Sequence, residues 1–341
     1  MTSPETAVLR LPMRPRLGTL SITFLTLVCV AGCGGGGGGS ATTNTSSNLL
    51  ATPPVMVSTA PVPVDAITLG PTTNTTTATN TSTQSTTPLP NTTLAGWTLV
   101  WSDEFNIDGL PDATKWDYDT DRNRVGWFNG ELQYYARDRA ENAKVEGGSL
   151  VITALRENLT TASDYGGQNY TSARLVTRGK SAWTYGFFEV RAKLPCGGGT
   201  WPAIWTLGTG GRWPEDGEID LMEQTGANKT QVLGTIHTRA YNYFNGSVGV
   251  GQGSSRTISD ACTEFHKYQL TWDASAISIG VDGVNYFTYA KPAGASNDRW
   301  PFDNPQYLLL NLAVGGSLGG TVNNASFPNR MEVDYVRVYQ R

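Results

Sequence analysis

The chain has 341 residues, a formal net charge of −4, only 16% charged residues and 39 glycines. This negative balance, without any basic cluster, gives no reason to expect nucleic acid as a partner. Aromatic and β-branched residues recur in short blocks and charged helix-forming runs are absent, so we predict one large β domain with extensions rather than two domains.

Residues 1–33 are typical of a targeting segment. Three arginines precede the apolar run 17–31, which is too short and too closely followed by glycine to predict a membrane span. The run ends in Val30-Ala31-Gly32-Cys33, which resembles a bacterial lipobox. Cleavage before Cys33 would let that residue carry lipid and anchor the protein at the outer membrane or cell surface. The alternative is an ordinary secretory signal cut nearby, with release of the protein.

Residues 34–95 begin with a run of glycines and continue as a Ser-, Thr-, Asn- and Pro-rich stretch. Low hydrophobicity and almost no charge predict a flexible tether that cannot bury a core. We therefore expect the folded domain to span residues 96–341, held away from a membrane surface.

The pattern within residues 96–341 is one of short strands separated by turns. Glycine-containing pairs at 147–148, 282–283 and 315–316 indicate turns, and no amphipathic helix exceeds two turns. Many short strands at this spacing predict an all-β sandwich of two antiparallel sheets. The expected strands include residues 150–154, 187–192, 268–272, 277–281 and 333–338.

Cys196 and Cys262 are the two cysteines of the expected domain. An exported protein permits a disulfide between them, and two free buried thiols are the alternative. A zinc site is not expected, because these cysteines and the histidines at 237 and 266 show no close ligand spacing.

Three carboxylates lie within six residues in Gly217-Glu218-Ile219-Asp220-Leu221-Met222-Glu223. The apolar residues between them favour a strand, on which Glu218 and Asp220 share a face. Glu223 would point to the other face unless a β-bulge at Leu221-Met222 restores it. The two glutamates would then be four strand steps apart, about 13 Å between Cα atoms, and their carboxyl groups could approach the roughly 5–5.5 Å of a retaining glycosidase.

Like charges this close cannot all ionise freely, so one glutamate should hold a proton near neutral pH and serve as an acid beside a nucleophile. The alternative is a chance acidic string on a solvated helix. Two indoles upstream, Trp201 and Trp205, favour the catalytic interpretation, because sugar rings pack on aromatic rings. Burial in the core is the alternative for either tryptophan.

Three stretches resemble a family 16 glycoside hydrolase, most of all its laminarinase (endo-β-1,3-glucanase) branch. They are YGFFEVRAKLPCGGGTWPAIWTLG (185–208), GEIDLMEQTG (217–226) and WPFDNPQYLLLNLAVGG (300–316). The similarity extends from about Trp97 to Tyr339, and the extra residue before the last glutamate matches the bulged pattern of the laminarinases. The resemblance implies a β-jelly-roll sandwich with an open substrate cleft, and a retaining mechanism with Glu218 as nucleophile, Glu223 as acid/base and Asp220 as orienting group.

The resemblance also implies a set of sugar-binding residues. Asn129 and Glu131 lie in a block like the family's N-x-E-x-Q-Y-Y, with a structural turn as the alternative. Arg174 matches the family's cleft arginine, and a surface ion pair is the alternative. His237 aligns with a histidine near the acid/base, and Trp213 is expected to line a sugar subsite. One departure is Leu318, where laminarinases often carry Trp, which leaves the preferred substrate open.

The family often binds a structural Ca²⁺ on its convex face. Carried over by position, its ligands would be Glu104, a carbonyl near Gly148, and Asp334, a chemistry that suits calcium. No cofactor is expected for catalysis.

The sequence therefore predicts a monomeric, retaining endo-hydrolase of β-1,3-glucans. Two alternatives stay open at this point. The first is the same chemistry on mixed-linkage glucan, agar or carrageenan, or transfer to a sugar in place of water. The second is a non-catalytic β-glucan-binding protein.

Overall fold

The computed structural model describes residues 94–243 and 251–341. The targeting segment, Cys33 and the tether up to residue 93 lie outside the described residues. Within them, helix is limited to one α-helix, α1 (Gly316–Gly319), and two 3₁₀ helices, η1 (Phe128–Gly130) and η2 (Asn324–Ser326). None of the helices in this part of the chain is long and apolar enough to cross a membrane. The predicted all-β class is confirmed.

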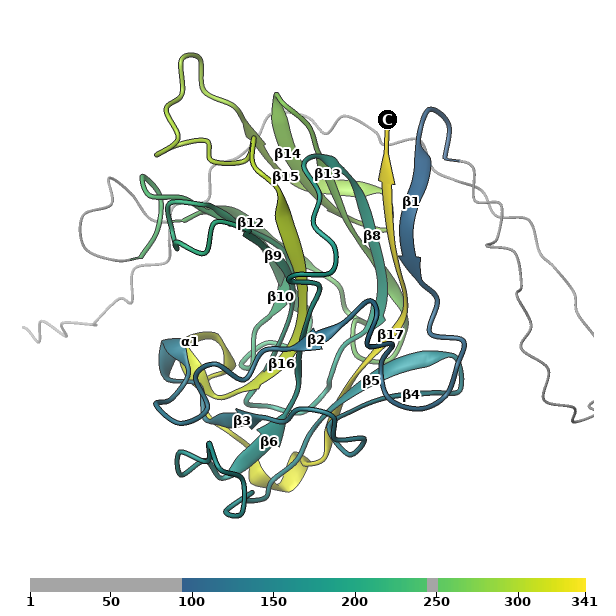
Figure 1. Ribbon diagram of the computed structural model, residues 1–341, viewed down its shortest axis with the longest axis vertical. Helices are drawn as coiled ribbons and strands as arrows, with labels where there is room; N and C mark the ends of the chain where they lie inside the picture. The colour runs from purple at the N-terminus through teal and green to yellow at the C-terminus, as the bar shows by residue number, and fades with distance from the viewer. Residues whose placement is uncertain (1–93, 244–250) are drawn as a thin grey trace, which may run out of the picture. The chain divides into compact units, whose positions relative to one another are not determined.

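Two antiparallel sheets form a β-sandwich of the jelly-roll type, in which several neighbouring strands are far apart in sequence (Figure 1). The eight-stranded sheet has the order β15-β14-β13-β8-β17-β5-β4, with β1 paired to β17. Its strands are β1 (Thr98–Asp103), β4 (Ala143–Glu146), β5 (Ser149–Ala154), β8 (Gly186–Lys193), β13 (His266–Trp272), β14 (Ala276–Val281), β15 (Val284–Ala290) and β17 (Asn329–Gln340).

The seven-stranded sheet carries the acidic strand and has the order β12-β11-β10-β9-β16-β7-β2. Its strands are β2 (Asp117–Tyr118), β7 (Arg174–Val176), β9 (Thr200–Gly208), β10 (Glu218–Gln224), β11 (Gln231–His237), β12 (Gln252–Thr257) and β16 (Gln306–Val314). Two short strands, β3 (Gln133–Tyr135) and β6 (Tyr170–Ser172), pair in parallel beside it.

The core lies between the sheets, because each strand alternates its side chains between the two faces. On β8, for example, Phe188 and Val190 are fully buried in the core, while Glu189 and Arg191 point to the opposite side. The faces turned away from the core are called the outer faces below. All five strands expected from the sequence are present, each extended by one to several residues.

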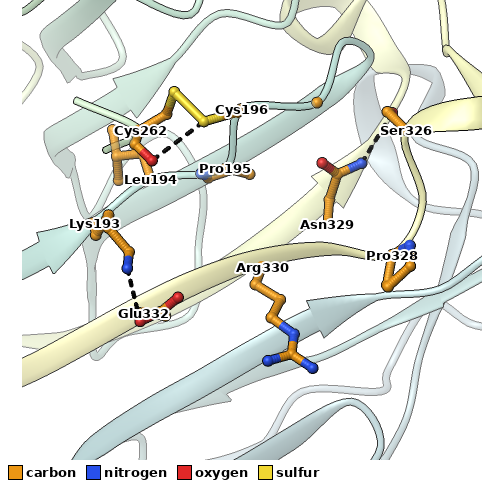
Figure 2. Close-up of a pocket in the computed structure, with 11 residues that line it drawn as sticks. Lys193, Leu194, Pro195, Cys196, Cys262, Ser326, Pro328, Asn329, Arg330 and Glu332 are labelled. Atoms are coloured by element: carbon orange, nitrogen blue, oxygen red, sulfur yellow. Dashed lines mark hydrogen bonds and ion pairs between the residues drawn. A yellow bond between two sulfur atoms is a disulfide. The ribbon is translucent and has the colours of Figure 1, made fainter. Parts of the chain in front are cut away.

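Cys196 and Cys262 form a disulfide, which settles the alternative that the sequence left open (Figure 2). The two cysteines are 66 residues apart, and the intervening chain contains β9, β10, β11 and β12. The bond therefore closes a loop around the strands at one side of the seven-stranded sheet, where the three carboxylates lie. It sits on the wall of a surface pocket that also includes Lys193 and Glu332.

Candidate active site

The acidic strand β10 runs between β9 and β11, and its register is interrupted as the sequence predicted. Pairing with β11 shifts between Asp220 and Glu223, and pairing with β9 shifts between Asp220 and Met222. Leu221 and Met222 are both fully buried on consecutive positions. This bulge places Glu223 on the same outer face as Glu218 and Asp220.

Gly217 fixes the point at which β10 begins. Its φ of 80° lies in the left-handed region, and a Cβ there would be 2.7 Å from Pro301 and 2.9 Å from Phe302. Only glycine fits a position that combines this backbone conformation with such close neighbours. The residue thus sets where Glu218 enters the sheet.

Glu218 is half-buried and receives a hydrogen bond from the indole N–H of Trp213. Its carboxyl group also shares a hydrogen bond with Asp220, two residues along the same face. Asp220 is 2% exposed, and its Oδ2 lies 3.3 Å from Nε2 of His237 on β11. Burial and the nearby Glu218 charge raise the pKa of Asp220 well above its ordinary value.

Glu223 lies further along β10 and accepts a hydrogen bond of 3.0 Å from the indole N–H of Trp201 on β9. Burial raises the pKa of Glu223 well above its ordinary value, and the Asp220 and Glu218 charges raise it further. His237 and the Trp201 hydrogen bond act in the opposite direction. Glu223 is therefore set up as a proton donor, which agrees with the expectation that one glutamate stays protonated.

The three tryptophans named from the sequence have different surroundings. Trp213 is the open one, with 40% of its surface exposed. Trp205 is half-buried and donates a hydrogen bond of 2.7 Å to Oδ1 of Asn311. Trp201 is buried and lies against Gly316 and Gly319 of α1. Its expected contact with sugar stays a prediction, and the structure shows a contact with Glu223.

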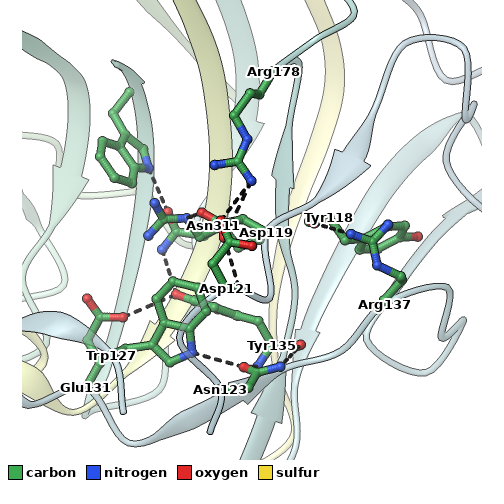
Figure 3. A network of polar contacts seen from close by, with 12 residues as sticks. Tyr118, Asp119, Asp121, Asn123, Trp127, Glu131, Tyr135, Arg137, Arg178 and Asn311 are labelled. Carbon is green, nitrogen blue, oxygen red and sulfur yellow. Dashed lines mark hydrogen bonds and ion pairs between the residues drawn. The ribbon is translucent and has the colours of Figure 1, made fainter. Parts of the chain in front are cut away.

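Arg174 begins β7, toward the other edge of the same sheet. It lies beside Asp119 and Trp127, which belong to a network of polar contacts (Figure 3). Its guanidinium carbon lies 5.0 Å from the ring centre of Trp127 and 4.7 Å from that of Trp205. Its Nε is 3.0 Å from Oδ2 of Asp119, and both side chains are largely buried. The ion pair is thus not an exposed surface contact, and the guanidinium contributes to an aromatic wall beside the carboxylates.

Glu131 joins this wall from the segment after η1. Its Oε2 accepts hydrogen bonds from Nε2 of Gln133 (2.8 Å) and from the Tyr135 hydroxyl (3.4 Å). Burial raises the pKa of Glu131, while Gln133 and the Arg174 charge oppose the shift. Asn129, with a φ of 59°, lies inside η1, so it is part of the turn that was the alternative interpretation, and its contact with sugar stays a prediction.

Sequence reasoning missed four residues that hold this wall together. Asn311 links Trp205 to Tyr135, because its Nδ2 donates 3.0 Å to the Tyr135 hydroxyl. A lone Asn within the apolar strand Tyr307-Leu-Leu-Leu-Asn311-Leu was a pattern that would have singled it out. The missed residues are Asp119, Trp127, Tyr135 and Asn311.

The expected calcium ligands are engaged by arginines in the structure. Glu104 accepts hydrogen bonds of 2.9 and 2.7 Å from Arg337, and Asp334 accepts one of 2.6 Å from Arg191. Gly148 lies in the turn between β4 and β5. These contacts do not bring the three positions together as a cation site, and the calcium site stays a prediction.

The outer face of the seven-stranded sheet thus combines a carboxyl group with a raised pKa, a second carboxyl group held by hydrogen bonds, and an aromatic wall. These are the groups that a glycoside hydrolase with two catalytic carboxyl groups requires. The family model for glycosyl hydrolases family 16 matches residues 131–337, and the chain belongs to that family.

Known proteins of this kind are similar along the same part of the chain. A β-glucanase from Rhodothermus marinus is 48% identical over 255 residues, covering 72% of this chain and 85% of that protein. The structure of SCLam, described as a non-specific endo-β-1,3(4)-glucanase, is 53% identical with a TM-score of 0.69 and covers 72% of this chain and 91% of its own. The structure of the laminarinase from Rhodothermus marinus is 48% identical with a TM-score of 0.67. The match covers 73% of this chain and 99% of that chain.

Proposed function

We propose that this protein hydrolyses β-1,3-glucosidic bonds within laminarin-type β-glucans and retains the anomeric configuration. The observation that carries the proposal is the bulge in β10, which brings Glu218 and Glu223 to one face. Each glutamate accepts a hydrogen bond from an indole N–H, from Trp213 and Trp201 respectively. Laminarinase relatives that cover nearly the whole described part support the substrate class.

In the first step, Glu218 attacks the anomeric carbon while Glu223 gives its proton to the leaving glycosidic oxygen. The bond to that oxygen breaks and a glycosyl ester forms on Glu218. In the second step, Glu223 takes a proton from water, the water oxygen attacks the same carbon, and Glu218 leaves. Asp220 holds Glu218 in place through their shared hydrogen bond.

The mechanism has a direct stereochemical test. Laminarin digested by the wild-type protein should yield mixed oligosaccharides, and proton NMR should detect their β anomer before mutarotation. Initial appearance of the α anomer would rule out two displacements at one carbon. Absence of any reducing ends would refute the enzymatic proposal and favour a β-glucan-binding role.

A second candidate substrate is mixed-linkage β-1,3-1,4-glucan. The similarity to SCLam, described as a non-specific endo-β-1,3(4)-glucanase, supports it, and Leu318 departs from the tryptophan frequent in laminarinases. Reducing-end assays on laminarin, mixed-linkage glucan, agarose and carrageenan would separate these substrates. Activity on agarose or carrageenan without activity on laminarin would overturn the β-1,3-glucan assignment.

We also infer that the protein is an exported monomer with a lipid anchor on Cys33, which lies outside the described residues. The basis is the Val30-Ala31-Gly32-Cys33 sequence alone. Growth with labelled palmitate should label the wild type but not Cys33→Ser, and the variant should leave the membrane fraction. Equal membrane association of both would count against the anchor. Light scattering of the purified protein would test the monomer.

A further inference from the structure

The outer face of β10 and β11 holds three side chains of types that bind metal ions. The proposed mechanism does not require a metal ion. Glu218, Asp220 and His237 each offer one donor atom, and all these atoms lie within 4.8 Å of one another. Glu218 and His237 are direct partners across the two strands. Two backbone positions fixed by sheet pairing therefore bring the three donors together.

Two of these donors are close to the spacing that a bound ion requires. Ligands about 2.1 Å from a tetrahedral zinc ion lie about 3.4 Å from each other. Oδ2 of Asp220 and Nε2 of His237 are 3.3 Å apart. These two side chains have the spacing to bind one ion, and the donor atom of Glu218 lies within 4.8 Å of both.

The same two side chains have unfilled hydrogen-bonding capacity. Asp220 is 2% exposed and His237 8% exposed. Among the described residues, neither Oδ2 of Asp220 nor Nδ1 of His237 has a hydrogen-bond partner. Buried polar atoms are normally paired, so the unpartnered Oδ2 of Asp220, which lies 3.3 Å from Nε2 of His237, marks a place where a ligand would gain a bond. The unpartnered Nδ1 is the other nitrogen of the ring.

The charge around the group also favours a cation. Within residues 94–243 and 251–341, the ion pairs give Glu218, Asp220 and Glu223 no lysine or arginine partner. A divalent ion would supply the positive charge that the side chains around it lack.

We propose that Glu218, Asp220 and His237 bind a divalent transition-metal ion such as Zn²⁺, and that the bound ion excludes the glucan. One imidazole with two carboxylates suits zinc or copper, whereas calcium and magnesium take oxygen ligands. Cysteine and histidine spacing gave no hint of this site, because two of its three ligands are carboxylates. The part of this proposal that concerns exclusion of the glucan rests on the proposed function, because the ion would bind Glu218, the proposed nucleophile.

The affinity should be moderate and the binding reversible. Zinc-bound histidines usually donate their other ring N–H to a carboxylate or carbonyl, which strengthens the site. His237 lacks that support on Nδ1 and lies beside Gly251, where a Cβ would be 2.9 Å from the same nitrogen. The protein would therefore lose activity when zinc is plentiful and regain it when the ion is removed.

The chain offers a matched control for the test, because it contains only two histidines. His266 also lies between carboxylates, with Nε2 3.1 Å from Asp260 and Nδ1 2.7 Å from Asp282. It is on β13, in the other sheet. Zn²⁺ titrated calorimetrically into the purified protein without glucan should bind the wild type and His266→Gln equally. His237→Gln should bind at least about tenfold more weakly.

Glu218→Gln should weaken zinc binding as well, and it decides the matter if His237→Gln does not fold. Mg²⁺ in excess should not displace the zinc. In wild-type assays Zn²⁺ should raise KM for laminarin without changing kcat, and EDTA should restore the original value. Undetectable zinc binding to the wild type, binding unaffected by either variant, or loss of binding in His266→Gln would overturn the site. Failure of laminarin hydrolysis without zinc would instead refute the proposed function and leave the calorimetric result standing.

Discussion

Both outer faces of the sandwich carry carboxylates, but the partners of these carboxylates differ between the two faces. On the eight-stranded sheet, Glu104 binds Arg337 and Glu332 lies 3.1 Å from Lys193. On the seven-stranded sheet, Glu218, Asp220 and Glu223 share one strand, and the described residues give them indole N–H groups and one histidine. The first arrangement neutralises charge, whereas the second keeps carboxyl groups available for chemistry.

The difference has an energetic cost on the functional side. Carboxylates without cations repel one another and lose solvation when buried, and both effects favour protonation. The structure accordingly raises the pKa of Asp220 and Glu223 well above ordinary values. Strongly shifted carboxyl groups that converge on one surface are typical of active sites, and the paired carboxylates of the other face are typical of structural contacts.

The largest expected effect comes from replacing one carboxylate on each face. Glu218→Gln should lower kcat on laminarin by more than about 10³-fold, because an amide cannot act as the nucleophile. Glu332→Gln should change kcat less than about twofold and the free energy of unfolding by less than about 1 kcal/mol, since its ion pair is partly exposed. Steady-state kinetics and urea unfolding measure both. Similar losses in the two variants would remove the functional distinction between the faces.

Glu223→Ala should have the next largest effect and separates the two roles of this residue. Activity on laminarin should fall by about 10²–10⁴-fold, because the leaving oxygen loses its proton donor. An aryl β-laminaribioside with a good leaving group should still react in the first step. Added azide should then give the β-glycosyl azide, whereas azide with Glu218→Ala should give the α product. The opposite stereochemistry would exchange the roles of the two glutamates.

Asn311 provides a prediction of intermediate size. Asn311→Ala removes the acceptor of the Trp205 indole N–H and one of the hydrogen bonds of the Tyr135 hydroxyl, which keeps its contact with Glu131, and should cost about 1–3 kcal/mol of stability. The matched control is Gln269→Ala on the other outer face, where the amide bridges Glu189 and the Gly283 N–H. Both variants should lose stability, but only Asn311→Ala should raise KM for laminarin. An equal KM in both variants would assign Asn311 to stability alone.

The sequence was sufficient to predict the strands, because they follow from local alternation of apolar and polar residues. The bulge did not follow from alternation, which places Glu223 on the other face, and was expected from the need to bring the carboxylates together and from the resemblance to laminarinases. It could not predict that Trp201 is buried against α1, since that depends on Gly316 and Gly319 more than a hundred residues away. The Arg174 site shows the same limit. The resemblance to the family was sufficient to single out Arg174. The residues around Arg174, which are Asp119, Trp127 and Trp205, come from three separate segments and could not be predicted. Whether Cys196 and Cys262 form a disulfide likewise depends on their distance in the fold, which the sequence does not give.

The smallest expected effect concerns the indole that donates to Glu223. The Trp201 hydrogen bond stabilises the ionised carboxylate and so lowers the Glu223 pKa against the larger effect of burial. Trp201→Phe removes that donor, and the pKa of Glu223 should rise further. Glu223 must be protonated to act as acid, so activity is lost as pH rises through its pKa. The alkaline limb of the kcat/KM profile on laminarin should therefore move to higher pH, with the acid limb little changed.

Trp116→Phe is the control for this prediction. It also removes an indole N–H from a carboxylate, the 2.8 Å hydrogen bond to Asp103, but on a residue buried in the core. Both substitutions should lower the melting temperature, because each leaves a carboxylate with one donor fewer. Only Trp201→Phe should displace the alkaline limb, because only Trp201 contacts the proton donor. An unmoved limb, or a shift to lower pH, would show that Glu223 is not the acid whose ionisation limits activity.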